Sequence, residues 1–102
     1  MQRKINGVMD LISFKNSVAA NEYPSSSSVY LQALWLDAKE RWNEAHQLIQ
    51  DLEDVHAAWI HAYLHRREGD NFNADYWYTR AGKNRPAFSL DKEWEQLVTA
   101  FL

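Results

Sequence analysis

The fold is decided by residues 59–82, which read WIHAYLHRREGD over 59–70 and NFNADYWYTRAG over 71–82. Gly69 and Gly82 each close a run of helix-compatible residues, and glycine accepts the left-handed conformation in which helices commonly end. Asp70 follows the first glycine directly, where its carboxylate can cap the next helix. The stretch therefore predicts two helices joined by a very short turn, and such helices are antiparallel neighbours.

Apolar residues at helical spacing extend this pattern over the whole 102-residue chain. Pro24 and the run Ser25–Ser28 interrupt it, because the residue before a proline is pushed out of the helical region. We expect an all-α single domain, residues 1–102, built as an antiparallel array of about six helices. The predicted helices lie near 6–20, 29–40, 42–52, 55–68, 71–81 and 90–101. They form an N-terminal helix (6–21), two helix pairs (29–52 and 55–82) and a C-terminal capping helix (89–102).

The composition excludes several classes of function. The net charge of −3 argues against sequence-independent binding of nucleic acid. The chain has no cysteine, so it has no disulfide, thiol nucleophile or thiolate zinc site. Its three isolated glycines form no phosphate-binding loop, and its clustered serines form no nucleophile elbow. No apolar run approaches the ~18 residues of a membrane span. We expect a cytoplasmic protein without a membrane partner.

A repeat with a spacing of 29 residues aligns small or apolar residues of the two helix pairs. The aligned positions are Ala33 with Ala62, Ala45 with Ala74, and Leu52 with Ala81. Small residues let two helices approach closely, so these positions mark where the helices of each pair meet. Because each repeat unit buries its apolar face only against its neighbours, the repeat predicts a stacked array.

The second unit resembles a tetratricopeptide repeat. The matching residues are the small Ala62, the turn Gly69-Asp70, the small Ala74, the bulky Tyr78, the later Ala81 and the closing Pro86. The first unit departs from the pattern, because Glu40 replaces the turn glycine and the spacing is shorter than that family's period of about 34 residues. We therefore describe two degenerate tetratricopeptide-like helix pairs. Residues 33–82 are also similar to a group of small bacterial proteins without an assigned activity.

The resemblance implies a binding face, because the inward side of each pair's first helix lines a concave groove in tetratricopeptide arrays. Carried over position by position, the face comprises Ser27, Tyr30, Leu34 and Asp37 in the first unit and His56, Trp59, Tyr63, Arg66 and Arg67 in the second. Helical geometry supports this independently, since positions 56, 59, 63 and 66 share one stripe. Aromatic residues beside an arginine suit a peptide or a carboxylate group. In the alternative, the N-terminal helix covers Trp59 and Tyr63 and leaves no groove.

A second candidate site is the helix face of His61, His65 and Glu68. Spacings of four and three place these side chains together, and His-x-x-x-His suits zinc, with Glu68 as an oxygen ligand. The glutamate that follows the first histidine in helical zinc hydrolases is missing. His56 lies on another side of the same helix. The alternative is two packed histidines, with His65 and Glu68 as an ordinary pair.

These observations predict a non-catalytic helical-repeat protein that binds a protein or peptide, or a second copy of itself. The alternative is a small metal-binding protein or metal-dependent enzyme that uses His61, His65 and Glu68 with zinc or another divalent metal. A third hypothesis is a structural homodimer whose interface uses the last helix, where Phe101 and Leu102 end the apolar stripe. We expect no other cofactor.

Overall fold

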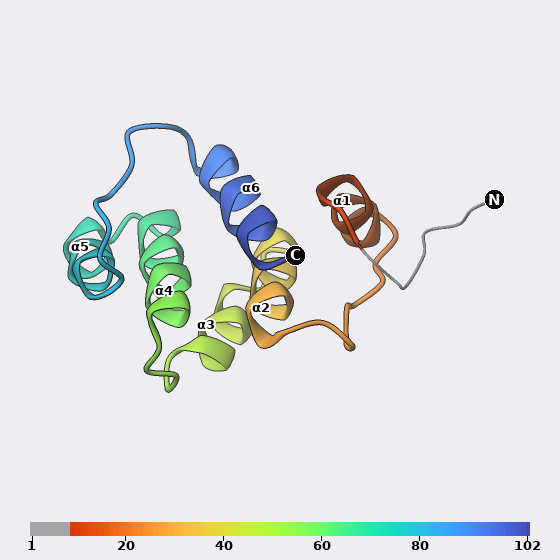
Figure 1. Cartoon of the computed structure of the whole chain (residues 1–102), viewed down its shortest axis with the longest axis horizontal. Helices are drawn as coiled ribbons and strands as arrows, with labels where there is room; N and C mark the ends of the chain where they lie inside the picture. Colours follow the sequence, from red (N-terminus) through yellow and green to blue (C-terminus); the bar gives the residue numbers. More distant parts are fainter. Residues whose placement is uncertain (1–8) are drawn as a thin grey trace.

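The computed structural model describes residues 9–102, which fold into six α-helices with no β-strand among them (Figure 1). The helices are α1 (Leu11–Ala19), α2 (Val29–Ala38), α3 (Trp42–Ile49), α4 (Val55–Arg67), α5 (Asn71–Arg80) and α6 (Leu90–Phe101). The predicted all-α helical array is confirmed. Within residues 9–102, every helix is too short or too polar to cross a lipid bilayer.

The first helix begins later than its sequence pattern predicts. The predicted start near residue 6 lies outside the described residues, and Met9 and Asp10 are not helical. The Asp10 carboxylate accepts a hydrogen bond from the Ser13 amide at 2.8 Å. An N-cap residue stands just before the first helical residue, so α1 begins at Leu11. Aspartate or serine side chains also cap α2, α4, α5 and α6.

The turns inside the two helix pairs have the same backbone conformation. Glu40 follows α2 with a φ of 60°, and Gly69 follows α4 with a φ of 86°. In both turns the next amide donates to the carbonyl five residues earlier, at 2.9 Å. This hydrogen bond is typical of helices that end on a left-handed residue. The two turns, at Glu40 and Gly69, therefore share one backbone conformation, although the first places a glutamate in the left-handed position.

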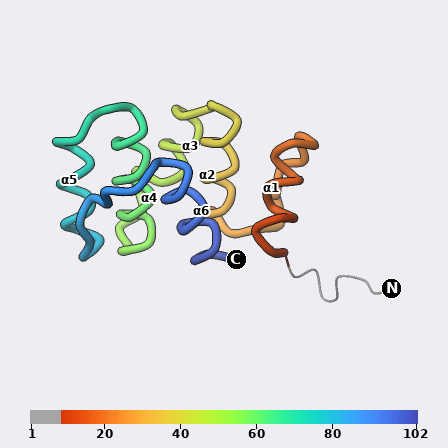
Figure 2. The backbone as a smooth tube through the Cα atoms, turned by 90° about the horizontal axis from the view of Figure 1, so that it is seen from above, coloured from red at the N-terminus to blue at the C-terminus, as the bar shows by residue number. Residues whose placement is uncertain are grey.

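The helices form two hairpins, α2 with α3 and α4 with α5, that stand side by side (Figure 1). α6 runs back across the array and contacts both α2 and α4, the first helices of the two pairs. α1 contacts α6 at the other end of the array (Figure 2). The C-terminal helix therefore joins the two hairpins to each other and to α1.

Small residues occupy the contacts between paired helices. Ala33, Ala45, Ala62 and Ala74, which the repeat aligns, are all fully buried. The volume around them is filled by large rings, of which Trp35, Tyr63 and Tyr78 are almost completely buried. Close helix approach at alanines and filling by aromatic side chains give a packed core from few positions.

Candidate functional site

Apart from Ser27, which precedes α2, the residues predicted as a binding face lie on α2 and α4, and α6 packs against both helices. We call these residues of α2 and α4 the α2–α4 face. At one end, the Phe101 ring of α6 lies among Tyr30, His56 and Trp59, with ring centroids 5.0, 5.3 and 6.0 Å away. The Tyr30 hydroxyl donates to the Asp54 carboxylate at 3.0 Å, which holds its ring in place. The aromatic part of the predicted face therefore receives an apolar side chain of the same molecule.

The middle of the face is joined to α6 by a hydrogen bond from a side chain of α6 to the backbone of α2. The Trp94 indole donates to the carbonyl of buried Leu34 at 2.9 Å. On its other side Trp94 meets Phe14 of α1, with ring centroids 5.8 Å apart. The helix that covers the face is therefore α6. The alternative considered from the sequence was that the N-terminal helix covers it. The expected groove is filled from within the chain.

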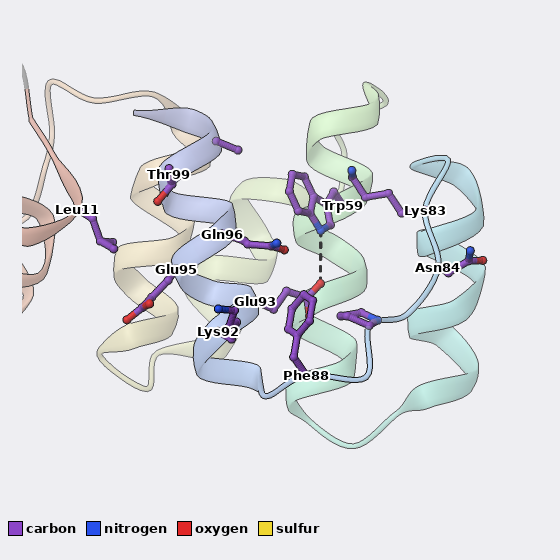
Figure 3. Close-up of a pocket in the computed structure, with 12 residues that line it drawn as sticks. Leu11, Trp59, Lys83, Asn84, Phe88, Lys92, Glu93, Glu95, Gln96 and Thr99 are labelled. Carbon is purple, nitrogen blue, oxygen red and sulfur yellow. Dashed lines mark hydrogen bonds between the residues drawn. The ribbon is translucent and has the colours of Figure 1, made fainter.

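Glu93 of α6 is the polar centre of this contact. Its side chain is 1% exposed, and its carboxylate accepts hydrogen bonds from the Tyr78 hydroxyl at 2.6 and 2.8 Å. Arg66 forms an ion pair with it at 2.9 Å. The Trp59 indole donates to it at 3.4 Å, and Figure 3 shows this hydrogen bond. Burial, and then the hydrogen bond to Glu93 and its charge, raise the pKa of Tyr78. Arg66 also donates to the Phe88 carbonyl at 2.5 Å, so one guanidinium links α4, α6 and the segment 81–89 that connects α5 to α6.

A second buried carboxylate belongs to Asp37 of α2. The Tyr63 hydroxyl donates to it at 2.8 Å, and Arg67 Nε lies 3.1 Å from its other oxygen. Burial raises the pKa of Asp37, and the hydrogen bond from Tyr63 and the charge of Arg67 oppose this change. Asp37 and Tyr63, both predicted as ligand-binding residues, are thus each other's partners across α2 and α4.

A groove of about 730 Å³ opens along the side of α6 (Figure 3). It is bounded by Trp59, by the segment that includes Lys83 and Phe88, and by one side of α6. The Lys83 ammonium lies 4.2 Å from the centre of the Trp59 ring, a cation–π contact. One side of α6 therefore lines an open groove, and another side contacts the α2–α4 face.

Sequence reasoning assigned α6 the role of a capping helix and missed Glu93. The signal was present in the stripe Leu90, Trp94, Leu97, Val98 and Phe101, because position 93 lies on the same side of a helix as 90 and 97. A carboxylate within an apolar stripe is buried on folding, and a buried charge needs a partner. The pattern therefore predicts a cation on the facing surface, which is Arg66.

A cluster of three histidines lies elsewhere on α4, at its contact with α3. Nε2 of His46 is 3.0 Å from Nε2 of His61, and His65 brings a ring nitrogen within 4.8 Å of both. Burial, and then the neighbouring His46 and His65, lower the pKa of His61 to about 4. Burial likewise lowers the pKa of His46. Both changes favour the neutral imidazole, the form of histidine that binds metal ions.

The histidine cluster differs in one member from the predicted metal set. His61 and His65 lie together as expected, but Glu68 is grouped with His65 and Asp70, apart from His61. Its carboxylate lies 3.5 Å from Nδ1 of His65. The third nitrogen comes from His46, which sequence reasoning missed because it lies on another helix, fifteen residues away.

The aromatic residues of α5 point in three directions. Tyr78 faces Glu93, and Trp77 stacks on His61 with ring centroids 3.9 Å apart. Phe72 and Tyr76 are 86% and 53% exposed. The adjacent residues Trp77 and Tyr78 therefore contact different centres, and Trp77 faces the histidine cluster.

Comparisons with protein-family models, curated proteins and solved structures found no match to this chain.

Proposed function

We propose that this protein is a non-catalytic helical-repeat scaffold whose α2–α4 face binds an amphipathic helix of a partner protein through one carboxylate. The observation that carries this proposal is the arrangement around Glu93, where Arg66, Tyr78 and Trp59 all donate to one carboxylate. In the free chain α6 occupies the face. The partner helix carries the same pattern, an apolar stripe that contains one glutamate.

The chemistry of the contact favours recognition over a purely structural role. Apolar residues of similar volume often replace a buried ion pair without loss of stability, so stability alone does not require Glu93. Arginine, tyrosine and tryptophan are the residues that most often dominate binding energy at interfaces. Docking of an amphipathic helix into an apolar groove is a recurring mode of recognition. Without α6, the α2–α4 face would offer an apolar groove together with hydrogen-bond donors for one carboxylate.

α6 then competes with the partner. It is joined to α5 by the segment 81–89, and such a tether gives the attached helix a millimolar effective concentration. A free helix therefore binds the wild-type chain weakly and binds more tightly when α6 is loosened. Exchange of α6 between two copies of the chain uses the same surface, and light scattering over a range of concentrations identifies that case.

The test is a titration of a fluorescent peptide with the sequence of residues 89–102 into the full-length protein. Glu93→Gln in the protein weakens its own α6 and leaves the face intact, so the peptide should bind this variant about tenfold or more tightly than wild type. Adding Arg66→Ala removes the arginine that pairs with the carboxylate and should abolish the tighter binding of the peptide. Glu95→Gln is the matched control, because Glu95 pairs with Lys15 of α1, away from the α2–α4 face.

Equal, weak binding of the peptide to wild type and to the folded Glu93→Gln variant contradicts the proposal. A peptide in which glutamine replaces the glutamate at position 93 provides the reciprocal test. It should bind the Glu93→Gln protein about tenfold or more weakly than the natural peptide, since it cannot pair with Arg66.

A further inference from the structure

We propose that His46, His61 and His65 form a binding site for a divalent late-transition-metal ion such as zinc. The three imidazoles come from two helices, α3 and α4, and their nitrogens converge within 4.8 Å. Three nitrogen ligands of this kind suit zinc, copper or nickel, and not magnesium or calcium, which require oxygen ligands.

The distances fit a metal ion. Zinc binds imidazole nitrogen at about 2.0–2.1 Å, so two nitrogens on one tetrahedral ion lie about 3.3–3.4 Å apart. The Nε2 atoms of His46 and His61 are 3.0 Å apart, a few tenths of an ångström from that value. His61 and His65 are four residues apart on α4, the helical spacing that lets two imidazoles bind one ion. Binding of an ion would draw the three nitrogens, which lie within 4.8 Å of one another, to one centre.

Aromatic packing holds two of the rings in position. Trp42 stacks on His46 at a centroid distance of 4.7 Å and an interplanar angle of 11°. Trp77 stacks on His61 at 3.9 Å and 16°. The Trp42 indole also donates to the Leu64 carbonyl at 2.7 Å, which joins α3 to α4 beside the cluster. Ligands whose rotamers are held by packing lose little freedom when the ion binds.

The carboxylate of Glu68 lies beside the third ring. It is 3.5 Å from Nδ1 of His65, and that nitrogen is buried without a hydrogen-bond partner in the described structure. Metal-bound histidines commonly direct their other ring nitrogen to a carboxylate. With Nδ1 facing Glu68, Nε2 of His65 is the nitrogen left to bind the ion. Three protein ligands leave one tetrahedral position for water or another ligand.

The experiment uses the full-length protein, purified without an affinity tag and stripped of metal, with zinc added as its chloride and followed by calorimetry. We expect saturable uptake of about one equivalent. His46→Ala, which changes a half-buried residue on α3, should lower the affinity at least about tenfold, and Glu68→Gln should lower it less. His56→Ala is the matched control, because His56 lies on α4 beside Phe101 and outside the cluster, and it should bind as wild type does.

Cobalt(II) provides a second measurement that also reports geometry. The wild-type protein should develop the intense visible bands of a tetrahedral cobalt site, and both His46→Ala and His65→Gln should lose them while circular dichroism shows a folded chain. No saturable uptake by wild type at zinc concentrations up to about 100 µM would overturn the proposal. Unchanged affinity in folded His46→Ala would also overturn it. Neither result bears on the α2–α4 face, which the peptide titration tests separately.

Discussion

The hydroxyl group of Tyr78 on α5 donates a hydrogen bond to the carboxylate of Glu93 on α6. Its oxygen lies 2.8 Å from Oε1 and 2.6 Å from Oε2, and both side chains are almost completely buried. The two residues lie fifteen positions apart and on opposite sides of the segment 81–89. With Arg66 they form a network in which each polar group has a partner. A buried network of this kind is costly to leave half-satisfied, so its members are sensitive positions for substitution.

Glu93→Gln should destabilise the protein. The change leaves the Arg66 guanidinium, 15% exposed, without its counter-charge, and loss of a charged partner at a buried site costs about 2–4 kcal/mol. Urea unfolding followed by circular dichroism measures this difference. Glu95→Gln, the control on the same helix, should leave the unfolding midpoint unchanged because its ion pair with Lys15 is solvent-exposed. Equal midpoints for Glu93→Gln and wild type would show that the network contributes nothing to stability.

The Tyr78 hydroxyl should make the protein sensitive to alkali. The pKa of a tyrosine in an unfolded chain is about 10, and burial together with Glu93 raises the pKa of Tyr78 above that value in the folded state. The unfolded chain therefore loses this proton first, so the contribution of Tyr78 is complete below pH 10 and is lost as the pH rises further.

Tyr78→Phe is the matching variant for this pH dependence. At pH 7 it should be less stable than wild type by about 1–2 kcal/mol, because one buried hydrogen bond is lost. Above pH 10 the difference in unfolding free energy between the two proteins should narrow. A difference that stays constant from pH 7 into this alkaline range contradicts the assigned role of the hydroxyl.

The turn between α2 and α3 should accept glycine with a gain in stability. Glu40 has a φ of 60°, a left-handed conformation that costs a residue with a side chain about 1 kcal/mol. Glu40→Gly should therefore stabilise the protein by an amount of that order, measurable as a higher unfolding midpoint.

Gly69→Ala is the reciprocal change in the second unit. A methyl group at Gly69 meets no atom within 4 Å, so its only cost is the φ of 86°. We expect a loss of about 1 kcal/mol. If both substitutions change stability in the same direction, the two turns do not impose the same backbone cost.

Local signals made the α4–α5 pair predictable. Gly69, Asp70 and Gly82 set the ends of its helices, and each acts through the conformation or hydrogen bonds of its own neighbourhood. The four alanines of the repeat were found for a similar reason, since helical periodicity shows which side of a helix is apolar. Predictions of helix ends were less accurate. Asp10 caps α1, which therefore begins at Leu11.

Two features could not be predicted from local signals. One is that α6 covers the α2–α4 face, and the other is that His46 joins the histidine cluster. The position of α6 depends on the match between Glu93 and Arg66, which lie 27 residues apart, and no local period encodes it. The meeting of His46 with His61 depends on how α3 packs on α4. The i,i+4 spacing of His61 and His65 was visible, so the sequence pattern indicated two of the three histidines.

The most direct test of the account compares the affinity of the 89–102 peptide for Glu93→Gln protein with its affinity for the Glu93→Gln, Arg66→Ala double variant. If the α2–α4 face recognises a helix through its carboxylate, the single variant binds the peptide in a saturable way and the double variant binds at least about tenfold more weakly. Equal affinity of the two folded proteins for the peptide would contradict that claim.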